Sequence, residues 1–273
     1  MSIIIPNKDH RDDLARCLNS ITEKEEYENY EIIIVENNSE QPDIFDYYES
    51  IEADDRINVV KYKGEFNFSA INNLGAGSAR GEYLLFMNND IEEIDGRLIT
   101  EMLNHSRRPE VGVVGARLYY ENETIHHAGL IVGYGGLAGH AFLGFDRTRY
   151  GSLDRIVCTQ DYSAVTAACL MTRADIFKNV GGFSEELAVA YNDVDYCLKV
   201  RRTGKLVVYT PYAVAYHYES SSRGYEDTPE KRARYDNEAR IFKGRWRHIL
   251  DAGDPYYNPN LSLSKDDFSL KLE

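Results

Sequence analysis

Acidic and amide side chains follow two apolar runs at the points where those runs end. Glu31–Val35 is followed by Glu36-Asn37-Asn38-Ser39, and Glu82–Met87 is followed by Asn88-Asn89-Asp90. Oxygen atoms of this kind accept hydrogen bonds from a ligand and coordinate hard divalent cations. Each cluster alone is also typical of a turn, because Asn and Asp bond their own backbone. Two clusters at one predicted sheet edge favour a ligand site.

A sheet must position these clusters, and the first half of the chain alternates β-branched runs with helical patterns, as βαβ units do. We predict an α/β fold with a mostly parallel central sheet flanked by helices. Ligands bind at the carboxyl ends of parallel strands, where both clusters lie. The predicted strands are Ile3–Ile5, Glu31–Val35, Asn58–Tyr62, Glu82–Met87 and Gly112–Leu118, and the predicted helices are one around Leu14–Ile21, then Asp43–Ile51, Ser69–Ala79 and Asp95–Arg107.

The second half has a looser pattern. Six glycines between Gly129 and Gly144 predict a long loop beside a site. The remaining predictions are an extended segment at Cys158–Met171, helices at Arg173–Asn179 and Asn192–Arg202, strands at Leu206–Thr210 and Ala213–Tyr218, a helix from Pro229 to about Leu250, and an irregular arm over residues 251–273.

The turn after the first predicted strand excludes two common nucleotide sites. It reads Pro6-Asn7-Lys8-Asp9-His10, and the first glycine of the chain is Gly64. Dinucleotide folds and P-loops need glycines at that turn so that the backbone can approach phosphate. A ligand at this turn therefore meets side chains.

The composition of the chain excludes further classes of protein. The 273 residues carry 31 Lys and Arg against 45 Asp and Glu, a net charge of −14, which argues against a nucleic-acid binder. Only the stretch 199–247 is basic, with 12 Lys and Arg against 6 Asp and Glu. No apolar run approaches the roughly 18 residues of a membrane span, and no basic leader precedes the first strand. We expect a cytoplasmic domain of a longer protein, with buried reduced thiols at Cys17, Cys158, Cys169 and Cys197.

Five segments in this order resemble the inverting family 2 glycosyltransferases, which have the GT-A fold. The closest resemblance is to bacterial enzymes of O-antigen and cell-surface polysaccharide synthesis, including rhamnosyltransferases. The segments are Ser2–Asp9, Ile34–Ser39, Ala79–Asp90, Val180–Phe183 and Tyr191–Arg201. The resemblance implies one domain over residues 1–250, with a nucleotide-sugar half at 1–118 and an acceptor and catalytic half at 119–250.

A nucleoside-diphosphate sugar donor is implied by the same resemblance, together with a glycan or lipid-linked saccharide acceptor. Glu36 stands where the family usually has an Asp that faces the base. The other donor-side positions implied by the resemblance are Pro6, Asn7, Asp9, Asn67, Asn72, Asn88 and Asn89.

Asn88-Asn89-Asp90 matches the family's D-x-D-type motif, in which the last Asp binds Mn²⁺ or Mg²⁺ at the diphosphate. This chain offers two asparagines and one carboxylate there. His217 resembles the family's distal metal-side histidine. Asp90 and His217 are therefore the implied metal ligands.

Asp193 matches the catalytic aspartate of the family's Glu-Asp motif, with Asn192 in place of the Glu. The implied mechanism is a single displacement, in which the carboxylate removes a proton from the acceptor hydroxyl. A helix N-terminus stabilises an ionised carboxylate at that position. Asp193 or Asn192 could also simply cap the helix, and capping is compatible with catalysis.

Several other residues have a functional and a structural interpretation. Arg223 could clamp the donor diphosphate or be a solvated loop charge. The basic face of the last helix is an exposed amphipathic surface, or docks at the inner face of a membrane. We interpret His126, His127 and His140 as parts of an acceptor-side loop rather than a metal cluster, with Tyr134, Phe142 and Phe145 as candidates to stack on sugars. Phe242 and Trp246 are expected in the core.

Two alternatives remain open. The asparagines at positions 88, 89 and 192 are compatible with a non-catalytic nucleotide-sugar or glycan binding domain of the same fold. A glycoside hydrolase with two carboxylates is the other alternative, but nothing in the nucleotide-edge pattern favours it.

Overall fold

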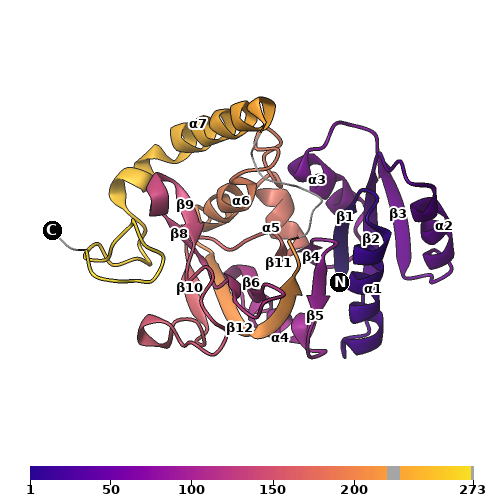
Figure 1. Ribbon diagram of the computed structural model, residues 1–273, viewed down its shortest axis with the longest axis horizontal. Coiled ribbons are helices and arrows are strands. Elements are labelled where there is room, and N and C mark those ends of the chain that lie inside the picture. Colours follow the sequence, from indigo (N-terminus) through magenta and orange to yellow (C-terminus); the bar gives the residue numbers. More distant parts are fainter. Residues whose placement is uncertain (220–227, 272–273) are drawn as a thin grey trace.

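A computed structural model describes residues 1–219 and 228–271 of the protein, which form a large mixed sheet with helices on both faces (Figure 1). The sheet order is β10-β12-β6-β11-β4-β1-β2-β3, with β5 paired to β12 and β7 paired to β6. A separate hairpin consists of β8 and β9. The strands are β1 (Ser2–Asn7), β2 (Glu31–Asn37), β3 (Ile57–Tyr62), β4 (Tyr83–Met87), β5 (Ile91–Glu93), β6 (Val111–Tyr119), β7 (Ile125–His127), β8 (Leu130–Val132), β9 (Ala138–His140), β10 (Gln160–Tyr162), β11 (Cys169–Arg173) and β12 (Leu206–His217).

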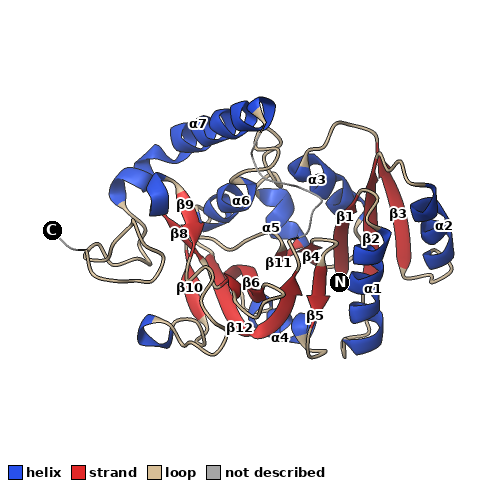
Figure 2. Cartoon of the chain, in the orientation of Figure 1, coloured by secondary structure: helices blue, strands red, loops and turns tan. Residues whose placement is uncertain are grey.

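The helices surround the sheet and are drawn in blue in Figure 2. The helix α7 runs along one side of the molecule, above α6 and the β8–β9 hairpin, and the N-terminal βαβ units lie at the opposite end (Figure 1). The helices are α1 (Arg11–Lys24), α2 (Pro42–Ile51), α3 (Phe68–Ser78), α4 (Leu98–Ser106), α5 (Ala174–Asn179), α6 (Asn192–Arg201) and α7 (Pro229–Ala252).

Pairing in the N-terminal half is parallel, whereas β11 is antiparallel to both β4 and β6. Successive side chains of β1 face opposite sides of the sheet, so that Ile4 packs in one core and Ile3 and Ile5 in the other. All three side chains are completely buried. Gly75 lets α3 approach this sheet, because a Cβ there would lie 2.5 Å from Cγ2 of Ile4.

The α/β prediction is confirmed, and the predicted strands and helices of the first half form within a few residues of their expected ends. The loop predicted over residues 129–144 is wrong in part, because β8 and β9 pair there across a short 3₁₀ turn. The strand β5 was not predicted. The two strands predicted after residue 205 form one strand, β12, whose pairing with β6 is irregular between Thr210 and Val214.

The thiol prediction is correct for three of the four cysteines. Cys17, Cys169 and Cys197 are buried and free, whereas Cys158 is free but exposed, because it lies in a turn between the short helix near Ser152 and β10. Within residues 1–219 and 228–271, none of the helices is both long and apolar enough to cross a membrane.

Candidate active site

A cavity of about 690 Å³ opens at the carboxyl ends of β1 and β4. Its wall comes from the loops after these strands, the segment 166–168, the first turn of α6 and the end of β12. Of the site residues expected from the sequence, it includes Pro6, Asn7, Asp9, Asn88, Asn89, Asp90, Asp193 and His217.

Side chains join the ends of β1 and β4 at the floor of this cavity. Asn89 Nδ2 donates to Asn7 Oδ1 over 2.6 Å, and Asn7 Nδ2 donates to the hydroxyl of Tyr48 over 2.7 Å. Asp9 Oδ1 accepts the amides of Glu40 and Gln41 at 2.7 and 2.8 Å. The Asn-rich turns therefore bond to each other as well as facing the cavity.

Asp90 and His217 meet although 127 positions separate them in the sequence. His217 Nε2 lies 3.2 Å from Asp90 Oδ1 and 3.3 Å from Asn88 Nδ2, and both Asp90 and His217 are buried. They meet because β5 pairs with the end of β12, with Ile91 opposite His217. Rotation of the Asn88 amide exchanges Nδ2 for Oδ1 with little change in shape.

A carboxylate, an imidazole and an amide oxygen fit a divalent cation such as Mn²⁺. In the part of the chain that the structure describes, no group of three or more His, Cys, Asp and Glu side chains is arranged to hold a metal ion. Asp90, His217 and the Asn88 amide oxygen after that rotation are the side-chain atoms that would hold a cation here.

Three other histidines lie near His217, and two of them, His126 and His140, line the cavity. Nδ1 of His126 lies 3.3 Å from Nδ1 of His217, and Nδ1 of His127 lies 3.1 Å from Nδ1 of His140. Burial lowers the pKa of His126 and of His127 well below 6.5, and the neighbouring imidazoles lower it further. These imidazoles are therefore neutral at pH 7.

Asp193 stands in the first turn of α6 with its carboxylate at the cavity. Oδ1 accepts the Val194 amide at 2.8 Å, and Oδ2 lies 3.4 Å from the Ala167 amide. The helix carries Asp193 and Asp195 in its first turn and Lys199 and Arg201 in its last, which complements the helix dipole. Asp193 thus takes part in the helix terminus and faces the cavity as well.

Side chains of α7 hold the segment that precedes Asp193. The buried carboxylate of Glu238 accepts the amides of Ala190 at 2.5 Å and Val189 at 3.3 Å. Tyr191 adopts a left-handed conformation with φ of 61°, and its hydroxyl bonds that of Tyr235 on α7 at 2.5 Å. The strained backbone at Tyr191 persists because Glu238 holds the amides that precede it and Tyr235 holds its hydroxyl.

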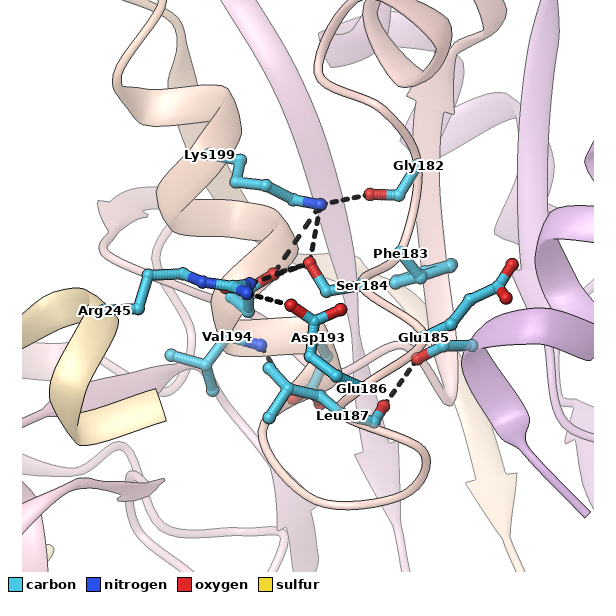
Figure 3. Close-up of polar contacts among 12 residues, drawn as sticks. Gly182, Phe183, Ser184, Glu185, Glu186, Leu187, Asp193, Val194, Lys199 and Arg245 are labelled. Carbon is cyan, nitrogen blue, oxygen red and sulfur yellow. Dashed lines mark hydrogen bonds and ion pairs between the residues drawn. The ribbon is translucent and has the colours of Figure 1, made fainter. Parts of the chain in front are cut away.

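Asp195 belongs to a different network from Asp193. Its carboxylate is completely buried and accepts from Arg245 Nη1 at 2.7 Å and Trp246 Nε1 at 2.8 Å. Lys199 and Arg245 both reach the hydroxyl of Ser184 (Figure 3). The expectation that the basic face of α7 is exposed is therefore wrong at Arg245, which turns inward because Asp195 needs a counter-charge. Phe242 and Trp246 lie in the core as expected.

Three expected donor-side residues do not line the cavity. Glu36 accepts the Ser39 amide at 2.6 Å and thereby shapes its own turn. Asn67 caps α3 by accepting the Ala70 amide at 3.0 Å, and buried Asn72 donates to the Phe68 carbonyl. Arg223 lies outside the described residues.

The aromatic prediction for the 129–145 segment is wrong for Phe142. Its ring is completely buried and stacks on Phe268 of the C-terminal arm, with ring centroids 4.9 Å apart. It turns inward because the arm covers this segment, where Phe142 N donates to the Asp266 carbonyl. Tyr134 and Phe145 are half-buried.

The cavity is also lined by His126 and His140, which the sequence analysis assigned to an acceptor-side loop. The cavity residues that were not predicted at a site are mainly Phe66, Tyr191, Lys231 and Arg234. Tyr191 directly precedes the Asn192-Asp193 pair, which is a signal that could have found it. No comparable signal exists for Lys231 and Arg234, because only the placement of α7 brings them to the cavity.

Known proteins resemble this chain in sequence and in fold. The profile of the family described as "Glycosyl transferase family 2" matches residues 2–181. An uncharacterised protein, y4gI, of Sinorhizobium fredii is 46% identical over 272 residues, and the O-antigen biosynthesis protein RfbC of Myxococcus xanthus is 37% identical over 275. Both alignments cover 99% of this chain, which spans 30% and 21% of the two relatives.

Solved structures show the same fold at low sequence identity. A mannosyltransferase of Pyrobaculum calidifontis, solved with GDP-Man and Mn²⁺, has a TM-score of 0.63 at 15% identity, over 92% of this chain and 68% of that one. GalNAc-T7, solved with UDP, GalNAc and Mn²⁺, has a TM-score of 0.67 at 12% identity, over 89% of this chain and 50% of that one. The fold is therefore that of the GT-A glycosyltransferases.

Proposed function

Since the chain belongs to glycosyl transferase family 2 and is a glycosyltransferase, we propose that it transfers a sugar from a nucleoside-diphosphate sugar with inversion at the anomeric carbon. The acceptor is a hydroxyl of a saccharide or lipid-linked glycan in cell-surface polysaccharide synthesis. One observation carries the proposal. Asp193 lines the same cavity as Asp90 and His217, which supports a shared site for the proposed base and the proposed diphosphate ligands.

The chemical step is a single displacement. The Asp193 carboxylate takes the proton of the acceptor hydroxyl as that oxygen forms a bond to the anomeric carbon. The bond from the anomeric carbon to the phosphate oxygen breaks on the opposite face, and the nucleoside diphosphate leaves with the electron pair. The amides of Val194 and Ala167 hold the carboxylate in place without neutralising it.

We assign donor binding to the side chains at the carboxyl ends of β1 and β4. Asn7, Asp9 and Asn89 present amide and carboxylate groups to the nucleoside side, while Asp90, His217 and the Asn88 amide oxygen would hold a divalent cation. The cation, Mn²⁺ or Mg²⁺, supplies positive charge to the departing diphosphate. An imidazole among the ligands favours Mn²⁺, because Mg²⁺ prefers oxygen ligands.

The relative RfbC, named for O-antigen biosynthesis, supports a polysaccharide acceptor. We place the reaction in the cytoplasm, at the inner face of the membrane. The exposed cations of α7, which include Arg232, Arg240, Lys243 and Arg247, suit an anionic lipid surface or the diphosphate of a lipid-linked acceptor.

A donor screen tests the proposed function. The purified protein is incubated with Mn²⁺ and a panel of UDP-, GDP- and dTDP-sugars, with and without oligosaccharide acceptors, and released nucleoside diphosphate is measured. We expect release from one donor class, an increase with acceptor and a loss with EDTA. Donor binding without release from any member of the panel would support a binding domain instead.

A further inference from the structure

His126 lies behind His217, on the side away from Asp90. Its Nδ1 is 3.3 Å from Nδ1 of His217, and the two rings are perpendicular with centroids 4.4 Å apart. Both side chains are buried. A hydrogen bond between these two Nδ1 atoms needs one of them to donate its proton and the other to accept with its lone pair.

The direction of this hydrogen bond decides what His217 offers on its other side. If His126 donates, the proton of neutral His217 lies on Nε2, which then has no lone pair for a cation at Asp90. If His217 donates, Nε2 presents its lone pair 3.2 Å from Asp90 Oδ1. Cation binding therefore needs His126 as the acceptor.

The surroundings of His126 favour that direction. With Nδ1 accepting, the proton of His126 lies on Nε2, and Nε2 is 3.7 Å from a carboxylate oxygen of Glu219. The ring of Tyr120 packs edge-on against His126 at 4.7 Å and fixes its plane. On another side the ring of His140 lies 5.2 Å away.

An irregular strand brings His126 to this position. Neighbouring side chains of a regular strand face opposite sides of the sheet, but the pairing of β7 with β6 shifts between Leu118 and Tyr119. His126 and His127 consequently both lie buried beside the cavity, one at His217 and the other at His140.

We propose that His126 is the positioning residue of the metal side: its Nδ1 accepts a hydrogen bond from Nδ1–H of His217 and so keeps Nε2 of His217 available to the cation. This inference rests on the proposed function, in which His217 is a metal ligand. Hydrogen bonds from behind a metal-bound imidazole fix its tautomer and orientation, and their loss typically weakens metal binding 10- to 100-fold.

Two variants separate hydrogen bonding from packing. In His126→Asn, the amide oxygen takes the place of Nδ1 and can still accept a hydrogen bond from His217. His126→Leu fills similar space without an acceptor. Mn²⁺ binding is measured by electron paramagnetic resonance of free Mn²⁺, with GDP or UDP present. We expect at least tenfold weaker binding in His126→Leu and a change below about threefold in His126→Asn. His248→Asn, on the outer part of α7, is the matched control and should bind as the wild type does.

Nitrogen-15 NMR of the histidines in the wild-type protein with diamagnetic Mg²⁺ gives a readout that does not depend on either variant folding. We expect the proton of His217 on Nδ1 and that of His126 on Nε2. The reverse tautomers, or equal Mn²⁺ affinity in His126→Leu and the wild type, would overturn the inference alone. Wild-type protein that binds no Mn²⁺ overturns the metal assignment of the proposed function together with the inference.

Discussion

Arg245 of α7 donates to Asp195 of α6 across 2.7 Å, inside the protein. The same carboxylate accepts from Trp246 and from the hydroxyl of Ser184 at 2.6 Å, and Lys199 lies 3.6 Å away. Side chains of α7 thus meet the buried charge of α6, although about fifty residues separate them in sequence. This network fixes the first turn of α6, which carries Asp193.

Replacement of Asp195 tests the contribution of that charge to stability. Asp195→Asn keeps the shape but leaves two cations beside a neutral amide, and a broken buried ion pair costs about 3 kcal/mol. We expect the free energy of unfolding in urea to fall by about that amount. The exposed pair Arg247–Asp251 on α7 is the control, since Arg247→Gln should change stability by less than about 0.5 kcal/mol. Equal effects of the two substitutions would contradict the assignment.

Asp193→Asn removes the proposed base while Oδ1 can still accept the Val194 amide. We expect sugar transfer to fall roughly 10²- to 10⁴-fold, because an amide does not accept the acceptor proton. The melting temperature and donor affinity should stay close to the wild-type values. Asp43→Asn, at the exposed first turn of α2, serves as control and should keep full activity. Near-normal transfer by a folded Asp193→Asn protein would assign the base elsewhere.

Asp90→Asn tests the metal side directly. The substitution keeps an oxygen at the site but removes its charge, so Mn²⁺ affinity in the presence of a nucleoside diphosphate should fall at least about tenfold. Calorimetric titration of Mn²⁺ measures this. Glu92→Gln changes a neighbouring carboxylate that pairs with Lys24 outside the cavity, and it should leave Mn²⁺ binding unchanged. The metal assignment fails if both variants bind like the wild type.

Glu93 lies outside the active-site cavity, and its raised pKa leads us to expect that the free energy of unfolding depends on pH. Burial, together with the nearby carboxylate of Glu25, raises the pKa of Glu93 from 4.5 to about 8. The folded state holds the Glu93 proton between those values and the unfolded state does not. Stability from this group is therefore fully present below about pH 4.5 and is lost as pH rises to about 8, by up to about 1.4 kcal/mol per unit.

Glu93→Gln should remove this dependence. The amide oxygen can still accept from Leu98 N, and the side chain has no titratable proton to lose. The free energy of unfolding in urea is measured at pH 5 and pH 8. Relative to the wild type, the variant should be more stable at pH 8 than at pH 5. The exposed Glu49 of α2 gives the control Glu49→Gln. A constant difference between variant and wild type across this range would mean that Glu93 is ionised in the folded protein.

Local patterns predicted most of the elements, because burial repeats along the chain with the period of the element. The apolar run of β2 and the spacing of Leu14, Cys17, Leu18 and Ile21 in α1 are examples. The β8–β9 hairpin was missed because its glycines favour turns, while its pairing depends on the partner strand. The burial of Phe142 likewise follows from a neighbour distant in sequence, Phe268.

For the site, local sequence was enough to predict that acids and amides stand at the ends of β1, β2 and β4 and that Asp193 begins a helix, since strand ends and helix termini are local features. Which of these side chains face one cavity depends on the tertiary structure. The fold places His217 beside Asp90 and His126 beside His217. Glu36 and Asn67 do not line the cavity, because their polar atoms bond the backbone of their own turn and helix cap. These outcomes depend on strand pairing and on the placement of α7, which join residues that no short stretch of sequence contains.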